Sequence, residues 1–458
     1  MAVDGETVRL RLGAVRVEMR WPRLPSQATV WLVAFAAAPP VLFWLIAVSA
    51  GLPHLHNDFH SYWYAGRLLA EGSSPYELEA LRAIAARHGD DFMVGTGYSY
   101  PLPFAFLMVP LSRLPFDAAL VVFNGLSIAL FAVAVAIWLQ RFHPHARPAW
   151  LRLAAALCGG WPPVLGSVVN GQANLLVLAA LAAAVSLVLG TSRARTAVGG
   201  VAIGLAAVVK LVPGVLVVPL WLAGHRRAAI TGAAIGFLAP LGVAAVLYPS
   251  ATADGAGLAT LLGPDPFVTN QSINGFVSRL VESSDRMTAL APGAFDPALP
   301  AALLTLSLAA ATVAVLWKVR SALATWDGLA AGLALSLVAA TAGAPKTSLW
   351  NLSLELVAIG LLLARVAPSD TGRSLDSLER GLLVAWWASA AVLPLVWLIG
   401  PLPAGPMAAL VVLLGSLGLY GSLSGWVLAA RRLLRLAPRS SDVRRSSPAG
   451  RLPAATSW

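Results

Sequence analysis

Charged residues are scarce in this 458-residue sequence: Asp, Glu, Lys and Arg together make up 12% of it, about half the share of a typical soluble domain. Cysteine is almost absent, which excludes a disulfide-stabilised secreted protein. The single Cys158 lies in an apolar run and is expected to be a small buried hydrophobic residue. Neither a Walker A nor a Rossmann glycine motif occurs in a suitable context, so no soluble nucleotide-sugar domain is expected.

Hydrophobic residues are abundant instead, at 58% of the chain, with a mean hydropathy of +0.75. This content excludes a disordered chain, and a water-soluble fold with so few charges could not cover that much apolar surface. A helix satisfies its own backbone hydrogen bonds inside the bilayer. The composition therefore predicts an all-α polytopic membrane protein.

A helix that crosses a bilayer needs about 20 mostly apolar residues. Residues 1–26 are too long and too rich in arginine to begin a signal peptide, so the apolar run after them is expected to remain as a first membrane helix. A further apolar stretch, 197–222, is interrupted by Lys210 and Pro213. The uninterrupted runs predict about ten transmembrane helices: 28–52, 117–139, 149–168, 173–190, 228–248, 300–317, 326–343, 351–366, 381–400 and 405–430.

Arginine is concentrated at both ends of the chain, in residues 1–26 and in the tail 431–458, which is expected to be disordered. Because positive residues favour the cytoplasmic side, both termini are predicted to be cytoplasmic, flanking a membrane domain of residues 27–430. The number of crossings is then even, which requires 197–222 to enter the membrane and return as a broken hairpin bent at Lys210–Pro213. This topology places three quarters of the 32 Lys and Arg residues in the cytoplasm. The net charge of +11 thus reflects orientation and a lipid-contacting tail, and no nucleic-acid partner is expected.

Two long loops, about 53–116 and 249–300, lie on the extracytoplasmic side in this topology. Residues 61–71 and 76–87 mix apolar and charged residues at helical spacing, and they predict short interfacial helices on the membrane surface. Most uncharged amides and the intramembrane lysine fall on the same side, so a functional site is expected there. The polar residues concerned are Asn170, Gln172, Asn174, Lys210, Asn270, Gln271, Asn274, Arg279 and Asn351.

Asp58 follows the first predicted span and precedes several aromatic residues, a position suited to a general base in a partly desolvated pocket. Its alternative interpretation is a helix N-cap. His54, His56, Asp58 and His60 alternate, so an extended segment would project all four to one side, where they could hold a divalent metal. No further ligand is evident in the sequence, and no metal is expected.

Lys210 places a cation inside an apolar stretch, which costs free energy in a membrane. A lipid-borne phosphate is its natural partner. Its alternative interpretation is a lysine that extends to the lipid headgroups. Arg279 is a candidate second phosphate ligand or, alternatively, a surface arginine. The amides can bind sugar hydroxyls without adding charge, although Asn is also a common turn residue.

Several of these features follow one another in an order that resembles glycosyltransferase family 87, integral-membrane enzymes of the GT-C superfamily that use polyprenyl-phosphate sugars. The similarity covers roughly residues 25–365. The matching features are Asp58, the run Tyr62 to Tyr76 ending in Gly72-Ser73-Ser74-Pro75-Tyr76, Tyr100-Pro101, Asn170-Gly171-Gln172-Ala173-Asn174, Lys210-Leu211-Val212-Pro213, and Asn270-Gln271-Ser272 with Arg279.

The resemblance implies a GT-C-like fold, Asp58 as the catalytic base, and Lys210 and Arg279 near the donor phosphate. We expect His60, Tyr62, Tyr100 and the amides to bind substrate. The chain departs from the family in two places. Tyr100-Pro101-Leu102 stands where Tyr-Pro-Pro is frequent, and Ala344-Pro345 with Trp350-Asn351 lacks the histidine common in mannosyltransferase members. The donor sugar therefore stays open between mannose, arabinofuranose and others.

The sequence thus predicts an inverting glycosyltransferase of the cell inner (plasma) membrane that needs no cofactor. Its expected partners are a polyprenyl-phosphate sugar, a glycan or glycolipid acceptor of the cell envelope, and membrane lipids, with the active site on the extracytoplasmic face. The alternatives are a lipid or solute transporter or flippase, because a charged break in a helix is also typical of transporters, and a structural subunit of an envelope complex.

Overall fold

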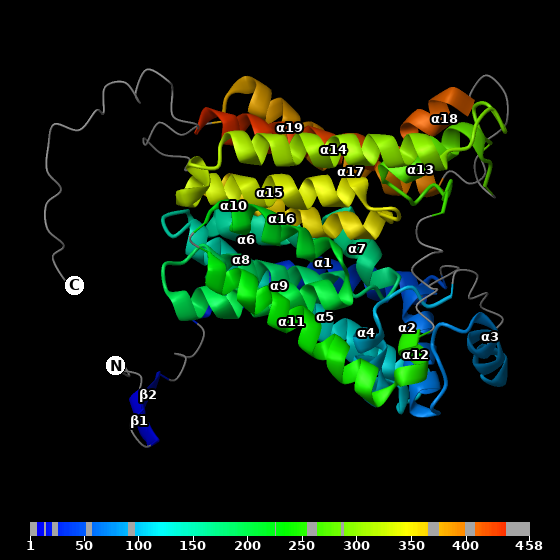
Figure 1. The fold of residues 1–458 in the computed structure, drawn as a ribbon, viewed down its shortest axis with the longest axis horizontal. Helices are drawn as coiled ribbons and strands as arrows, with labels where there is room; N and C mark the ends of the chain where they lie inside the picture. Colours follow the sequence, from blue (N-terminus) through cyan, green and yellow to red (C-terminus); the bar gives the residue numbers. More distant parts are fainter. Residues whose placement is uncertain are drawn as a thin grey trace, which may run out of the picture.

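The computed structural model describes residues 7–12, 15–20, 26–51, 57–89, 97–224, 226–253, 263–284, 288–364, 375–398 and 408–436. Helices dominate these residues, as predicted, and most of them run along one common direction (Figure 1). The helices of the first half are α1 (Gln27–Ser49), α2 (Asn57–Ala70), α3 (Leu78–Arg87), α4 (Leu102–Ser112), α5 (Phe116–Phe142), α6 (Pro148–Gly159), α7 (Pro162–Val169), α8 (Asn174–Val188), α9 (Arg193–Val209), η1 (Val212–Leu216) and α10 (Val217–Leu222).

The second half begins with α11, which follows the predicted hairpin, and ends with α19 near the C-terminus. Its helices are α11 (Arg227–Leu247), α12 (Pro249–Ala253), α13 (Ile273–Val281), α14 (Ala298–Lys318), η3 (Ala322–Ala324), α15 (Trp326–Gly343), η4 (Leu349–Leu354), α16 (Glu355–Leu363), α17 (Ser377–Leu398), α18 (Ala408–Leu414) and α19 (Leu417–Arg435). Two short antiparallel strands, β1 (Thr7–Leu12) and β2 (Val15–Arg20), precede the bundle and were not predicted.

Five helices in the described part of the chain, α1, α5, α11, α14 and α15, are long and apolar enough to cross a membrane. Of the best 18-residue window, 72% is buried in α15 but only 17% in α14, so α15 is central and α14 faces outward. Of the other five predicted runs, 381–400 falls on the 22-residue helix α17, and the remaining four fall on shorter or divided helices. One of them, 149–168, is divided between α6 and α7 because Pro162 and Pro163 cannot continue a helix.

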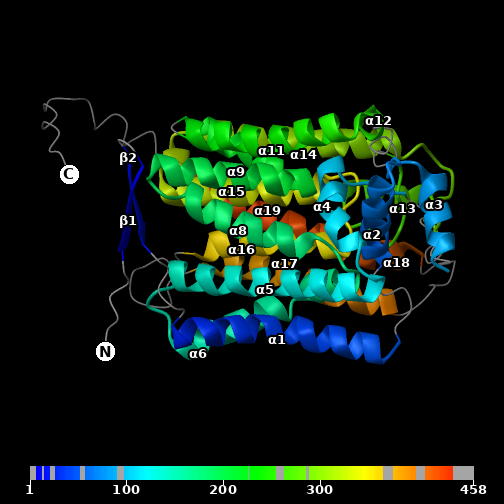
Figure 2. The same cartoon turned by 90° about the horizontal axis from the view of Figure 1, so that it is seen from below.

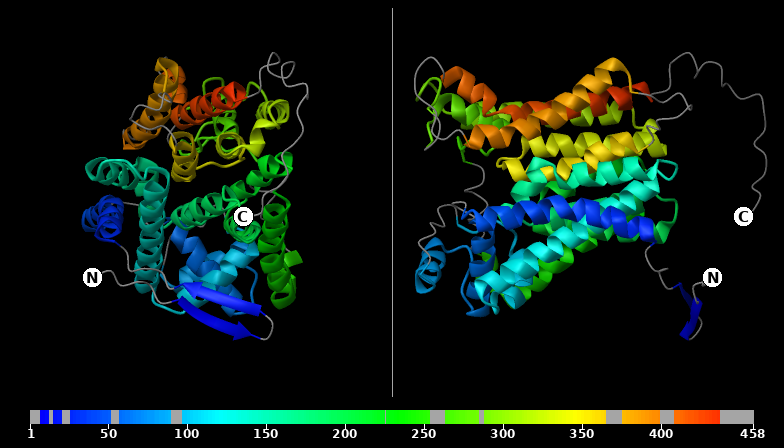
Figure 3. Two further views of the ribbon diagram at one scale, coloured as in Figure 1. Left: turned by 90° about the vertical axis from the view of Figure 1, so that its left-hand side faces the viewer. Right: turned by 180° about the vertical axis from the view of Figure 1, so that it is seen from behind.

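The short helices of the two predicted outer loops gather at one end of the bundle. In Figures 1 and 2, α2, α3, α12 and α13 lie at this end, and β1 and β2 lie at the other. The views in Figure 3 place α1 and α19 so that α1 begins and α19 ends at the end near the strands. This arrangement agrees with an even number of crossings, and the assignment of that end to the cytoplasm stays a prediction.

The predicted hairpin is confirmed by the parallel packing of α9 and α11. A Cβ atom built on Gly200 would lie 2.0 Å from the carbonyl oxygen of Ala229, and one on Gly204 would lie 2.3 Å from that of Ala233. Each step of four residues along α9 thus matches four residues along α11 in the same direction. The chain between them must therefore return to the end at which α9 began, and it turns back immediately after Lys210.

Glycines make this close approach possible. Gly200 and Gly204 on α9 face α11, while Gly232 and Gly236 on α11 would place Cβ atoms 2.2 and 2.3 Å from carbonyl oxygens of α9. Two small-xxx-small motifs thus pack against each other, which is a common way to join helices in a membrane. This contact fixes α9, and with it the position of Lys210 at its C-terminus.

Residues 431–435, the start of the predicted tail, are helical, because α19 continues to Arg435. Asp376 accepts the backbone N–H of Glu379 at 2.8 Å at the start of α17, and its carboxylate pairs with Arg431 at 2.9 Å and Arg435 at 2.8 Å. The backbone N–H of Glu379 and these two guanidinium groups lower the pKa of Asp376. These arginines therefore anchor α19 to α17, and residues 437–458 lie outside the described part of the chain.

Substituting Gly204 with alanine should destabilise the protein by about 1–3 kcal/mol, because the added methyl group meets a backbone carbonyl that cannot move independently. The matched control is Gly242→Ala on α11, where an added Cβ has nothing within 4 Å. Thermal unfolding of the two variants in detergent measures the difference. Equal melting temperatures would contradict the close α9–α11 contact.

Candidate active site

The turn after α7 holds the first residues of α2 in place. The backbone N–H groups of Asp58 and Phe59 donate to the carbonyl oxygen of Asn170, at 3.2 and 3.4 Å. Gly171 has φ +63°, and a Cβ there would lie 2.5 Å from the Cβ of Phe59. Only glycine combines this backbone conformation with so close a neighbour. The turn thus serves to position Asp58.

Asp58 lies in the first turn of α2, after Asn57, so it is not the N-cap that the alternative interpretation assumed. The helix also contradicts the extended conformation that the metal hypothesis required for Asp58 and His60. Residues two apart on a helix point about 200° away from each other. Asp58 and His60 therefore face opposite sides of α2, and His54 and His56 lie outside the described residues. In the described part of the chain, no three His, Cys, Asp or Glu side chains form a group that could hold a metal.

Tyr62, one helical turn after Asp58, joins a hydrogen-bonded network with Tyr100 and Gln172. The Tyr62 hydroxyl donates to the Tyr100 hydroxyl at 2.6 Å, and the Tyr100 hydroxyl donates to Oε1 of Gln172 at 3.1 Å. Tyr62 and Gln172 are buried, whereas Tyr100 is partly exposed. Three predicted residues from distant parts of the sequence are therefore in direct contact.

Lys210 approaches the same network from the end of α9. Its Nζ donates to Oε1 of Gln172 at 3.2 Å and to the Oδ1 atoms of Asn174 and Asn351. Nζ also lies 5.7 Å from the ring centroid of Tyr100. The ammonium group is therefore held by neutral amides inside the protein, and it does not extend toward lipid headgroups as the alternative interpretation required. Among the described residues, no carboxylate forms an ion pair with it.

Gln172 connects Asp58 to Lys210. Burial raises the pKa of Asp58 above its ordinary value, while a hydrogen bond with the Gln172 side chain and the charge of Lys210 act in the opposite direction. Oε1 of Gln172 accepts from Lys210, so one side chain interacts with both charged residues. The carboxylate and the ammonium thus act on each other electrostatically within one cluster, although no ion pair joins them among the described residues.

The cluster has an accessible part and a supporting part. Asp58, Tyr100, Lys210 and Asn351 are partly exposed, and Tyr62, Gln172 and Asn174 are buried beneath them. Asn170 contributes to the turn, because its Nδ2 donates to the carbonyl oxygen of Gly166 at 2.9 Å. An acid, a cation and neutral hydrogen-bonding groups are thus presented together, which suits a ligand with both hydroxyl and anionic groups.

The predicted residues of the second outer loop form a separate cluster. Asn270 accepts the backbone N–H of Thr347 at 3.0 Å, and Asn274 donates to the carbonyl oxygen of Pro345 at 2.9 Å. The Gln271 amide donates to the carbonyl oxygen of Gly415 at 2.7 Å. These contacts attach residues 263–281 to the segment that leads to Asn351. The three amides therefore satisfy backbone groups in this structure and do not contact Lys210.

Arg279 is 1% exposed, so it is not the surface residue that one interpretation assumed. Its guanidinium donates to the carbonyl oxygens of Phe267 at 3.1 Å and Asn270 at 2.7 Å, and to Oγ of Ser416 at 2.8 Å. Burial lowers the pKa of Arg279 to about 10, with Asp265 opposing the change. These contacts attach Arg279 to residues 267–270 and to Ser416, and none of them involves Lys210.

The sequence analysis missed a buried carboxylate, Glu355 at the start of α16, which is 1% exposed. Glu355 accepts from Nε1 of Trp386 at 2.5 Å and from Oγ of Ser422 at 2.6 Å, so it joins α16 to α17 and α19. An acidic residue inside an apolar run was the signal that could have identified it. Its satisfied hydrogen bonds indicate a structural function.

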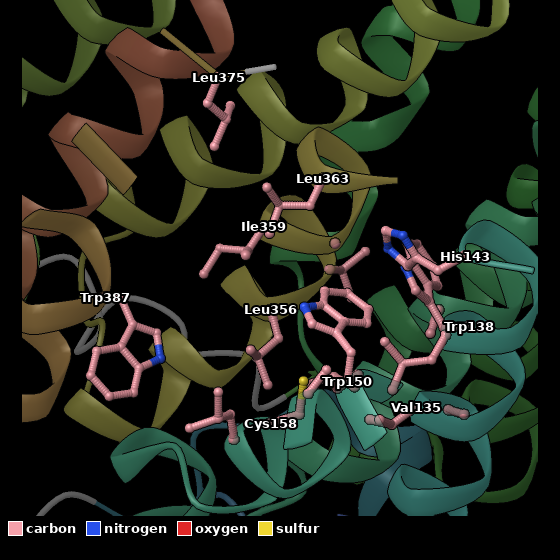
Figure 4. Close-up of a pocket in the computed structure, with 18 of the residues that line it drawn as sticks. Val135, Trp138, His143, Trp150, Cys158, Leu356, Ile359, Leu363, Leu375 and Trp387 are labelled. Carbon is pink, nitrogen blue, oxygen red and sulfur yellow. The ribbon is translucent and has the colours of Figure 1, made fainter. Parts of the chain in front are cut away.

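A cavity of about 580 Å³ lies away from this cluster, between α5, α6, α16 and α17. Its lining is mainly apolar and includes Trp138, Trp150, Leu356 and Trp387 (Figure 4). None of the predicted site residues lines it. The charged groups Asp58 and Lys210 therefore lie outside this cavity.

Comparisons with known proteins place the chain in a family. The crystal structure of ArnT from Cupriavidus metallidurans bound to undecaprenyl phosphate is similar at 15% sequence identity and a TM-score of 0.40, over 88% of this chain and 78% of that chain. A comparison with curated proteins gave no match. The sequence profile of glycosyltransferase family 87 matches residues 98–345, just over half of the chain. The chain therefore belongs to glycosyltransferase family 87 and is an integral-membrane glycosyltransferase.

Proposed function

We propose that this glycosyltransferase transfers a sugar from a polyprenyl-phosphate carrier to a glycan or glycolipid acceptor on the extracytoplasmic face of the plasma membrane. The observation that supports the proposal most strongly is that Gln172 serves both charged residues: its Oε1 accepts from Lys210 Nζ at 3.2 Å, and its side chain lowers the pKa of Asp58. One end of the site offers a proton acceptor and the other a positive charge. A transferase that attacks with a hydroxyl and releases a phosphate needs both.

In the proposed reaction, Asp58 removes the proton of the acceptor hydroxyl as its oxygen forms a bond to the anomeric carbon. The bond from that carbon to the phosphate oxygen breaks, and its electron pair leaves with polyprenyl phosphate. Attack and departure on opposite faces invert the configuration. Lys210 stabilises the charge on the departing phosphate, and the proton ends on Asp58.

The other residues of the site orient the substrates in this proposal. Tyr100 and Asn351 are partly exposed and can bind sugar hydroxyls, while the buried Tyr62, Gln172 and Asn174 keep the reactive groups in place. The leaving group is a monophosphate that one ammonium can neutralise in part, so no metal is required. Membership in a glycosyltransferase family favours this reaction over the transport alternative.

Asp58→Asn should lower transfer by about 10²–10⁴-fold, because the amide keeps the shape of the side chain but cannot take the proton. The assay is transfer from a radiolabelled polyprenyl-phosphate sugar by the purified protein. Asp117→Asn, at an exposed position at the start of α5, is the matched control and should keep full activity. A folded Asp58→Asn enzyme with unchanged turnover would rule Asp58 out as the base.

Lys210→Met should lower kcat/KM by about 10²–10³-fold, the usual effect of removing a group that stabilises a developing charge. Lys210→Arg keeps the charge and should recover part of the activity. Lys318→Met, at an exposed position at the end of α14, controls for the loss of a lysine. A Lys210→Met enzyme as active as the control would contradict the proposed stabilisation of the phosphate.

The pH profile of kcat/KM should report the raised pKa of Asp58. Since the base must be ionised, activity should fall as the pH drops through a value above the ordinary range of aspartate. Gln172→Met removes a hydrogen bond that lowers this pKa, so the acidic limb should move to higher pH. Gln140→Met, at the far end of α5, should leave the profile unchanged. An unchanged acidic limb in Gln172→Met would contradict the assignment.

A further inference from the structure

A second pocket, of about 610 Å³, lies on the face of α2 opposite to Asp58. His60, Tyr64 and Arg67 line it from α2, and they project on average about 200° away from Asp58 around the helix. Arg113 and Phe116 close it from the other side. The predicted substrate residue His60 therefore belongs to this pocket and not to the Asp58–Lys210 cluster.

The pocket is basic, and the rings of Trp63, Tyr64 and Phe116 form its aromatic floor. Four of its lining side chains are His60, Arg67, His88 and Arg113, and no carboxylate lines it among the described residues. The Arg67 guanidinium carbon lies 4.6 Å from the centroid of the Trp63 ring. Trp63 is 2% exposed and fixed by a hydrogen bond from its Nε1 to the carbonyl oxygen of Leu114 at 3.2 Å. Arg67 is thus held in place, and no carboxylate of the described residues forms an ion pair with it.

Phe116 indicates the level of the pocket in the membrane, because this residue begins the 27-residue membrane helix α5. Its ring stacks on that of His60, with centroids 4.2 Å apart. Trp63 and Tyr64 lie beside them, which is the aromatic composition expected where a membrane protein meets the lipid headgroups. The groups found at that depth are phosphate esters, and the planar guanidinium groups of arginine match phosphate oxygens.

We infer that this pocket binds a phosphate group, such as that of a lipid headgroup, at a site separate from the proposed donor site. Arg67 and Arg113 bind the phosphate oxygens, and the aromatic floor contacts the apolar part of the same molecule. No bond is made or broken. The inference does not depend on the transfer reaction, because Lys210 has no part in it.

The test measures binding of dihexanoyl phosphatidylglycerol, dihexanoylglycerol and inorganic phosphate to the purified full chain by calorimetry. The lipid that carries phosphate should bind, and Arg67→Gln/Arg113→Gln should weaken it about 30-fold, the effect expected for two cations near a membrane surface. Binding of inorganic phosphate that is equally sensitive to the double variant would identify a soluble phosphate compound as the source. Equal binding of dihexanoylglycerol, or no effect of the double variant, would overturn the inference.

Three controls keep the result interpretable. Arg82→Gln/Arg87→Gln removes two arginines of α3 that pair with Glu79 and Glu71, and it should leave binding unchanged. Arg67→Lys/Arg113→Lys keeps the charges and should retain most of the binding, which separates charge from folding. Lys210→Met should also retain it. A loss of binding in Lys210→Met would place the phosphate at the proposed donor site and overturn the inference.

Discussion

The central constraint on this structure is the lysine ammonium that α9 carries into an apolar bundle. A cation at that depth is costly unless it is solvated by the protein or by a ligand. Here Gln172, Asn174 and Asn351 supply three neutral oxygens, which reduce the cost without cancelling the charge. A carboxylate partner would stabilise the lysine more fully, but it would also remove the attraction for an anion. The amides therefore preserve a positive site that a phosphate can occupy.

Several contacts elsewhere in the fold hold Lys210, Asp58 and Asn351 in position. The α9–α11 glycine contact fixes the helix that ends at Lys210, and the turn at Gly171 sets Asp58 against Gln172. The loop before α14 reaches the site indirectly: Arg279 and the amides near it hold residues 345–348, which lead into Asn351. Residues far from the reacting groups are thus needed to place them, which is the usual function of a second layer around a site.

The sequence was sufficient to predict the features that depend on local pattern. Apolar runs predicted the helices, and the charge balance of the loops predicted the reversal at Lys210, which the parallel register of α9 and α11 confirms. Spacing could not decide which amides contact the lysine. Asn174 and Asn274 are the same residue type near the start of a helix, and only tertiary packing distinguishes them. The alternation around Asp58 does not put its side chains on one face for a related reason. A two-residue period implies one face only in an extended chain, and Asn57–Ala70 is a helix. The facing glycines of α9 and α11 could have been recognised from their four-residue spacing.

The most direct test of the account is an experimental structure of the purified protein with a polyprenyl monophosphate bound. The account predicts a phosphate oxygen within about 3 Å of Lys210 Nζ, replacing at least one of its amide contacts, with Asp58 facing the space beside it. A phosphate bound elsewhere, with Lys210 still enclosed by its three amides, would contradict the proposal that this cation receives the leaving group.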